Sequence, residues 1–150
     1  MTFTCKPFAD LSVFELYDIM ALRQEVFVVE QNCPYLDADG KDLASHHLQC
    51  RNAQGKLVAY TRLLPVGVSY PTYASIGRVV SSPSLRGTGI GKMLVAESLA
   101  KIKQLFGDAP IKIGAQSYLL QFYENQGFVS TGEAYLEDGI PHTKMMWKTI

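Results

Sequence analysis

The feature that most constrains this chain is a glycine-rich turn between a strand-like segment and a long amphipathic segment. The turn is Arg86-Gly-Thr-Gly-Ile-Gly91, and the preceding Tyr73–Ser81 is rich in β-branched residues, which predicts a strand. The segment after the turn has the apolar stripe of a helix at Val95, Leu99, Ile102 and Phe106. A strand, a glycine turn and a helix N-terminus together favour the binding of a phosphate group by backbone amides.

Different phosphate-binding loops fit this turn to different extents. A Walker loop requires GxxxxGK followed by Ser or Thr, but Met93 follows Lys92, and Arg86 stands where the first glycine belongs. A dinucleotide-binding loop requires GxGxxG, and Lys92 takes its last position. The pattern Arg-x-x-Gly-x-Gly suits a pyrophosphate bound without a metal by amides, Arg86 and Lys92. A plain strand-to-helix connection is the other interpretation.

The remaining periodicities predict an α/β chain with a mainly antiparallel sheet. Ser12 and Glu15 have the spacing of a capping box, and residues 12–29 are expected to be helical, in one or two pieces. A short helix is expected over Tyr118–Gln126, ended by Gly127. The predicted strands are Thr2–Phe8, His47–Arg51, Lys56–Leu64, Tyr73–Ser81, Ile111–Ala115, Phe128–Tyr135 and His142–Lys148. This order places a strand–helix–strand unit at the centre of the fold.

Length and composition predict a single domain over residues 1–150. The chain is 47% apolar, and its 14 basic and 14 acidic side chains give a formal net charge of zero. No basic run predicts a nucleic-acid partner, and no apolar run reaches the roughly 18 residues that a membrane span needs. Cys5, Cys33 and Cys50 lack the spacing of metal ligands, so reduced thiols and a cytoplasmic location are expected.

No metal site is expected either. The acidic run 37–42 resembles a calcium loop, but an EF-hand needs Gly at its sixth position and Glu at its twelfth, where Asp42 and Leu48 stand. The adjacent His46 and His47 would point to opposite faces of a strand, which does not suit zinc. The acidic run is therefore expected to be a solvated turn or lid.

Two stretches resemble the signatures of the GCN5-related N-acetyltransferase (GNAT) superfamily. The stretch IGRVVSSPSLRGTGIGKMLV is similar to its acetyl-CoA-binding motif, and YLLQFYENQGF is similar to its second signature. In addition, LRQEVFVVEQNCPYLDADGKD and EDGIPHTKM resemble the ElaA-like acyltransferase group. The resemblance covers nearly the whole chain. It implies the GNAT fold, a mixed, mostly antiparallel sheet of about seven strands flanked by helices, with splayed central strands.

The resemblance also implies roles for individual residues, with acetyl-CoA as cosubstrate. Tyr123 matches the general acid that protonates the departing thiolate, although by position alone it is equally a core tyrosine. An amide near Val79 or Val80 would polarise the thioester carbonyl, and Gln116 stands where many members have Asn. The residues expected to bind coenzyme A are Val79, Val80, Ser81, Arg86, Gly87, Thr88, Gly89, Ile90, Gly91, Lys92 and Gln116.

The acceptor side is less defined by the resemblance, because the general base varies within the superfamily. Glu30 and His46 are the candidate catalytic bases. Arg78, Asp42 and His142 are candidate acceptor-binding residues, and the last two are also alternative bases. The acidic character of the segment after the first helix favours a cationic acceptor.

These observations predict transfer of an acetyl group from acetyl-CoA to an amine of a small molecule or peptide, by direct attack in a ternary complex. A homodimer is expected from the superfamily's usual assembly. Two alternatives stay open. One is a non-catalytic module that senses acyl-CoA. The other is transfer of a longer acyl chain, because Arg23-x-x-Val-Phe27 faintly resembles acyl-homoserine-lactone synthases.

Overall fold

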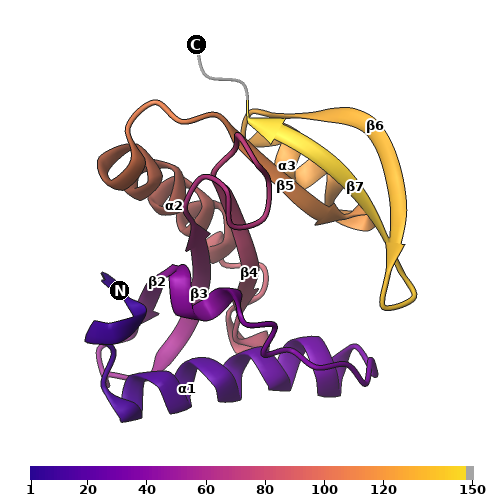
Figure 1. The fold of residues 1–150 in the computed structure, drawn as a ribbon. Helices are drawn as coiled ribbons and strands as arrows, with labels where there is room; N and C mark the ends of the chain where they lie inside the picture. Colours follow the sequence, from indigo (N-terminus) through magenta and orange to yellow (C-terminus); the bar gives the residue numbers. More distant parts are fainter. Residues whose placement is uncertain (148–150) are drawn as a thin grey trace.

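The structure is a computed structural model that describes residues 1–147, and its strands form two antiparallel sheets (Figure 1). The strands are β1 (Thr2–Pro7), β2 (His46–Arg51), β3 (Leu57–Leu64), β4 (Ser75–Ser81), β5 (Ile111–Gln116), β6 (Phe128–Glu137) and β7 (Ile140–Trp147). All seven predicted strands are present to within a few residues at each end. Lys148, the predicted end of the last strand, lies outside the described residues.

Helical segments alternate with these strands. They are η1 (Phe8–Asp10), α1 (Val13–Arg23), η2 (Gln24–Glu30), η3 (Lys41–Ala44), η4 (Pro83–Leu85), α2 (Ile90–Phe106), η5 (Ser117–Leu119) and α3 (Leu120–Asn125). The capping box at α1 is confirmed: Glu15 N donates to Ser12 Oγ over 3.0 Å, and Ser12 N donates to Glu15 Oε1 over 2.9 Å. The predicted helix of residues 12–29 has two pieces, because the α-helix changes to π-helical geometry at Gln24.

The two sheets meet at one point between β4 and β5. One sheet has the order β1-β2-β3-β4 and the other β5-β7-β6. A parallel bridge joins Ala74 to Ile111, and Lys112 N donates to Ala74 O over 3.0 Å. Beyond this bridge the two strands separate, which confirms the predicted splay of the central strands.

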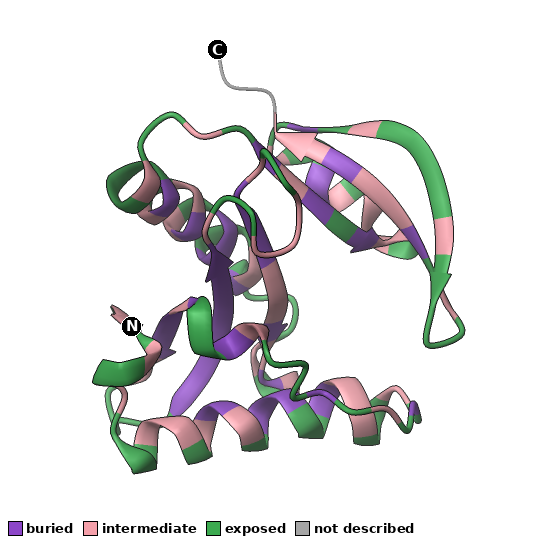
Figure 2. Cartoon of the chain, in the orientation of Figure 1, coloured by how far each residue is buried: buried purple, intermediate pink, exposed green. Residues whose placement is uncertain are grey.

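Two helices sandwich the first sheet, as Figure 1 shows. On one face, α1 packs Ile19 and Leu22 against Tyr60 of β3. On the other face, α2 places Leu94 in a larger core that extends over both sheets and includes Met145 of β7. Figure 2 shows these buried positions in purple along the facing sides of the strands and helices. Among the described helices, none is long and apolar enough to cross a membrane.

A bulge in β4 accounts for the separation of the central strands. Tyr60 pairs with Val80 and Arg62 with Gly77, so Arg78 and Val79 have no partner in the register with β3. Arg78 has a φ of 51°, in the left-handed region that non-glycine residues rarely adopt. A bulge bends its strand and increases its twist, so β4 turns away from β5 at this residue.

Candidate active site

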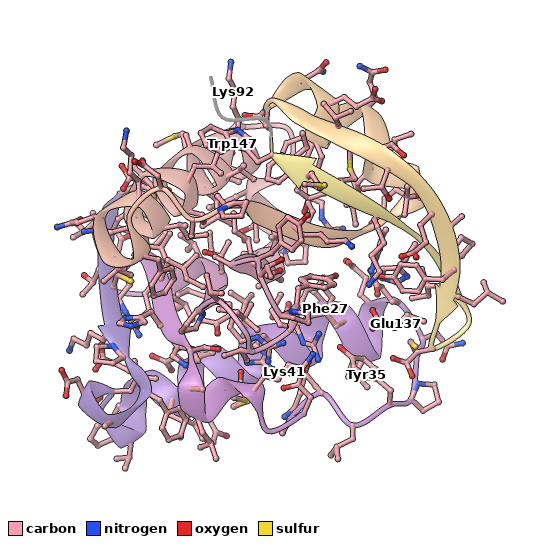
Figure 3. All side chains as sticks on the ribbon, turned by 45° about the horizontal axis from the view of Figure 1, so that its top comes forward. Phe27, Tyr35, Lys41, Lys92, Glu137 and Trp147 are labelled. Atoms are coloured by element: carbon pink, nitrogen blue, oxygen red, sulfur yellow. The ribbon has the colours of Figure 1, made fainter. Side chains whose placement is uncertain are left out.

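A cavity of about 1190 Å³ occupies the fork between β4 and β5. Its walls come from both strands, the glycine-rich turn, α3, η2 with the loop that follows it, and the β6–β7 hairpin. The tip of the hairpin touches that loop, where Cys33 Sγ lies 3.4 Å from Asp138 O. All five residues labelled Phe27, Tyr35, Lys41, Glu137 and Lys92 in Figure 3 line the cavity. The first four lie close together in that view, and Lys92 lies apart from them, near the top. The cavity thus has two ends.

The glycine-rich turn forms one end of the cavity. Gly87 and Gly89 have φ values of 80° and 84°, and Gly89 is the N-cap residue of α2. These left-handed conformations favour glycine, and the turn leads into the helix N-terminus, where the first backbone amides have no partner within the helix. The Thr88 amide is an exception, because it donates to Leu85 O over 3.3 Å. Arg86 and Lys92 line the cavity beside them, whereas Thr88 is not part of the wall described and donates its hydroxyl proton to Leu85 O.

The guanidinium of Arg86 is already engaged across the cavity. Arg86 Nη2 donates to Glu30 Oε1, so the end of η2 contacts the glycine-rich turn. This hydrogen bond lowers the pKa of Glu30. A carboxylate with a lowered pKa is a weaker base. The structure therefore places Glu30 on the cavity wall but couples it to the predicted phosphate-binding arginine.

Tyr123 lies on the cavity wall at the base of α3. Its side chain is buried and packs edge-on against Phe122 and Phe128, with ring centroids 5.1 and 5.7 Å apart. Burial raises the pKa of its phenol, so the hydroxyl keeps its proton at neutral pH. The hydroxyl has no hydrogen-bond partner among residues 1–147. A protonated phenol with a free hydroxyl at a cavity can act as a proton donor.

Backbone groups of β4 line the same fork. Val79, Val80 and Ser81 are all on the cavity wall, and the bulge removes Val79 from the ladder with β3. On the opposite strand, Gln116 makes a reciprocal pair of amide hydrogen bonds with Gln31, over 3.2 and 3.3 Å. Gln116 therefore lines the cavity with its side chain bound to Gln31, the residue that follows η2.

Two of the candidate bases lie away from the cavity wall. Asp42 is buried and accepts hydrogen bonds from Arg23 and Arg62 over 2.7 and 3.0 Å. Burial raises its pKa, but the two arginines outweigh burial and lower the pKa overall. His46 packs edge-on against Phe106, with ring centroids 5.6 Å apart. This placement supports neither acceptor binding by Asp42 nor catalysis by His46, because structural partners engage both residues.

The expectation of a solvated acidic run is wrong. Asp37 and Asp42 are buried, and with Asp39 they bind Arg23, Arg62 and Arg78 in one network. Asp37 joins the arginines of two elements, since Arg23 Nε and Arg78 Nε approach its two oxygens at 2.8 and 2.7 Å. The network anchors the loop after η2 to β3 and β4.

Arg78 and His142 do reach the cavity. Arg78 lines it while bound to Asp37, and its guanidinium lies 5.7 Å from the ring centroid of Tyr35. His142, on β7, packs on Tyr135 with the ring centroids 5.4 Å apart. Its Nδ1 lies 2.7 Å from Ile140 O, which can only accept, so the proton is assigned to Nδ1. Its Nε2 lies 3.4 Å from Glu137 Oε2.

Other lining residues were not predicted from the sequence. They are polar or aromatic and include Lys41, Arg62, Ser69, Tyr70, Tyr135 and Lys144. The strand alternation that places His142 and Lys144 on one face was the available signal, but it required knowing which face of β7 is uncovered. Among residues 1–147, no group of three or more His, Cys, Asp or Glu side chains is arranged to hold a metal ion.

Comparison with known proteins gives one consistent family. The sequence model of the acetyltransferase (GNAT) domain matches residues 37–149. The chain is 43% identical to the protein ElaA of Escherichia coli over 145 residues, which is 95% of this chain and 93% of ElaA.

Solved structures agree with the sequence match. An acyl-CoA N-acyltransferase from Pseudomonas aeruginosa superposes with a TM-score of 0.91 at 45% identity, covering 99% of this chain and 100% of that one. The crystal structure of E. coli ElaA gives a TM-score of 0.90 at 39% identity, covering 98% and 99%. The fork, the glycine-rich turn and these matches lead to one conclusion: the chain belongs to the GNAT acetyltransferase family, in its ElaA-like group.

Proposed function

We propose that this protein transfers an acetyl group from acetyl-CoA to an amine by direct attack in a ternary complex. The observation that carries the proposal is the fork itself. It has a glycine-lined helix N-terminus at one end, unpaired backbone of a bulged strand along one side, and the free hydroxyl of Tyr123 on its wall. Family membership supports acyl-CoA as the donor.

Each part of the fork has a role in this reaction. The amides of Gly87, Gly89, Ile90 and Gly91, with Arg86 and Lys92, would bind the pyrophosphate of coenzyme A. The amide of Val79 or Val80 would donate to the thioester oxygen as negative charge develops on it. The amine nitrogen forms its bond to the acetyl carbon as the carbon–sulfur bond breaks, and Tyr123 gives its proton to the leaving sulfur.

The amine must lose a proton before or during its attack. An alkylammonium has a pKa of about 10.4, so the neutral form costs about 4.6 kcal/mol at pH 7. Among the candidate bases, the geometry favours His142, which lies on the cavity wall with its Nδ1 bound to Ile140 O and its Nε2 3.4 Å from Glu137. The carboxylate of Glu30 lies at the other end, bound to Arg86.

The proposal is tested by thiol release from acetyl-CoA in the presence of polyamines, amino acids, aminoglycosides, arylamines and peptides. Intersecting initial-rate lines are expected for direct attack, and parallel lines would contradict it. Octanoyl-CoA as a second donor separates acetyl transfer from transfer of a longer chain. Acetyl-CoA that raises the Tm without any turnover would favour the non-catalytic module.

A cytoplasmic location is part of the same proposal. It is supported by the three cysteines, all of which are free in the structure. The homodimer remains a prediction from the superfamily.

A further inference from the structure

The two glycines of the fork lie level with each other. Both stand three residues beyond the bridge that joins Ala74 to Ile111, one at Gly77 in β4 and one at Gly114 in β5. Arg62 is the partner of Gly77 in β3, and Lys144 is the partner of Gly114 in β7. Residues paired across strands project on the same face of the sheet. The two glycines therefore flank the opening of the fork, and the cationic side chains of Arg62 and Lys144 lie on the neighbouring strands beside them.

Because neither glycine has a side chain, polar atoms of neighbouring residues approach the backbone closely on this face. A Cβ at Gly114 would lie 2.1 Å from Tyr135 Oη and 3.7 Å from Tyr70 Oη. A Cβ at Gly77 would lie 3.7 Å from Arg62 Nε. That Nε is buried and has no hydrogen-bond partner within the described chain. The face therefore concentrates hydrogen-bond donors around the opening.

Two lysines converge on this face from different elements. Lys144 Nζ donates to Tyr70 Oη over 3.0 Å, and Lys41 Nζ donates to the neighbouring Ser69 Oγ over 3.1 Å. Both lysines line the cavity, and within residues 1–147 neither has a carboxylate at ion-pairing distance. The tyrosine rings hold the Lys144 ammonium at 4.7 Å from Tyr70 and 4.5 Å from Tyr135.

The three aspartates of the loop after η2 are already neutralised by arginines, whereas Glu137, also on the cavity wall, lies 3.4 Å from His142. Asp37, Asp39 and Asp42 bind three arginines, so they leave little negative charge for a cationic acceptor. Burial lowers the pKa of Lys144, but the hydrogen bond to Tyr70 and the charges of Tyr70, Tyr135 and Glu133 together outweigh burial and raise the pKa overall. Lys144 is therefore a fixed positive charge on the cavity wall.

We infer that the acceptor amine also carries a carboxylate, and that Lys144, assisted by Lys41, binds this carboxylate and determines acceptor specificity. The inference rests on the proposed function. His142 and Lys144 are two residues apart on one face of β7, which is about 7 Å along a strand. An amine at His142 and a carboxylate at Lys144 can therefore belong to one small molecule. The sequence favours a cationic acceptor, and this inference adds a carboxylate to it, so that the acceptor is zwitterionic.

The test compares matched acceptors with acetyl-CoA as donor. The panel contains α-amino, ω-amino and aminobenzoic acids, each beside its carboxamide, its decarboxylated amine and its phosphonate analogue. Wild-type kcat/KM is expected to be about tenfold or more higher for the carboxylate form than for the amide of at least one acceptor. Acetyl-CoA binding, measured calorimetrically in the same preparation, tests the proposed function separately.

Variants of Lys144 test whether this residue causes the preference for carboxylated acceptors. Lys144→Met, which keeps the apolar stem, is expected to raise KM for the carboxylated acceptor about tenfold or more and to change KM for its amide and for acetyl-CoA less than about twofold. Lys144→Arg is expected to restore part of the preference. Lys112→Met is the matched control, because Lys112 Nζ also faces Tyr70, at 5.2 Å, but is not on the cavity wall.

Four outcomes would overturn the inference. They are equal rates for carboxylates and amides, equal losses for both in Lys144→Met, a preference for the phosphonate, and no turnover of any carboxylated amine by a protein that binds acetyl-CoA. The last outcome leaves acyl-CoA binding standing and removes only the acceptor assignment.

Discussion

Arg78 Nε donates to Asp37 Oδ1 over 2.7 Å, and this ion pair holds the bulged residue of β4 beside the fork. Arg78 holds a left-handed backbone, with a φ of 51°, and a non-glycine residue in that conformation costs about 1–2 kcal/mol. The same carboxylate binds the fully buried Arg23. The loop after η2 and the bulge of β4 are therefore coupled through one aspartate.

Two substitutions at Arg78 separate the backbone strain from the ion pair. Arg78→Gly and Arg78→Ala both lose the contact with Asp37, but only glycine adopts the left-handed conformation without strain. Arg78→Gly is expected to be more stable to urea than Arg78→Ala by about 1 kcal/mol. Equal stabilities would show that the conformation changes when the ion pair is lost.

Asp37→Asn removes the carboxylate that couples the loop after η2 to the bulge of β4. Removing one partner of a buried ion pair leaves an uncompensated charge, so the free energy of unfolding is expected to fall by about 3–5 kcal/mol. Asp18→Asn, which weakens a half-exposed pair with Arg51, is the control and is expected to cost less than about 1 kcal/mol. A similar small loss for both variants would contradict a structural role for the network.

Acid is expected to destabilise the protein through the same network. Burial raises the pKa of Asp39, but the hydrogen bonds and charge of Arg62 outweigh burial and lower the pKa from 3.8 to about 2. A lowered pKa means that the stabilisation is complete above about pH 4 and is lost as pH falls towards 2. Urea midpoints measured between pH 5 and 2 should fall less steeply in Asp39→Asn than in the wild type. Equal slopes of the urea midpoint against pH in the two proteins would show that Asp39 does not contribute to the loss of stability in acid.

The carboxylate of Glu30 competes with a bound pyrophosphate for the guanidinium of Arg86. Arg86→Ala is expected to weaken coenzyme A binding about 10- to 100-fold. Glu30→Gln removes the competing carboxylate and is expected to tighten binding by up to about fivefold, because exposed ion pairs are weak. Calorimetric titration with coenzyme A measures both. Unchanged affinity in Arg86→Ala would place Arg86 outside the site.

Glycine is expected to be required at position 114 because a side chain has no room there, not because the backbone adopts a conformation that favours glycine. Gly114→Ala places a Cβ 2.1 Å from Tyr135 Oη, and such crowding typically costs about 1–3 kcal/mol. Adding Tyr135→Phe removes that oxygen and should recover most of the loss. Gly77→Ala is the control, because the nearest atom to its Cβ is Leu64 Cδ1 at 3.5 Å. Thermal unfolding of the wild type, the two single glycine variants and the double variant measures these differences. No recovery of the Tm in the double variant would contradict this explanation.

The parts of the site that lie close together in sequence could be predicted from it. The turn from Arg86 to Gly91, the strand before it and the helix after it carry their own signals of glycine content and periodicity. Tyr123 followed from a local motif. The splay of the central strands came with the family resemblance, since no local pattern in Val79–Ser81 reveals a bulge.

The acceptor wall could not be predicted in the same way. Arg62 lies in a strand whose residues are all buried, and its environment depends on the loop that brings Asp39 to it. Lys144 and Tyr70 are 74 residues apart and meet only because β7 pairs with β5 in one register. The acidic run has a composition typical of a solvated loop, and only tertiary contacts with three arginines show that Asp37 and Asp42 are buried.

The most direct test of the central claim is thiol release from acetyl-CoA with an active acceptor, measured for the wild type and for Tyr123→Phe. The account predicts an acetylated amine as product and a loss of about 100-fold in kcat for the variant, with the Kd for acetyl-CoA unchanged. A loss of less than about threefold would contradict proton donation by Tyr123. Absence of any acetylated amine from a wild-type protein that binds acetyl-CoA would contradict the acetyltransferase itself.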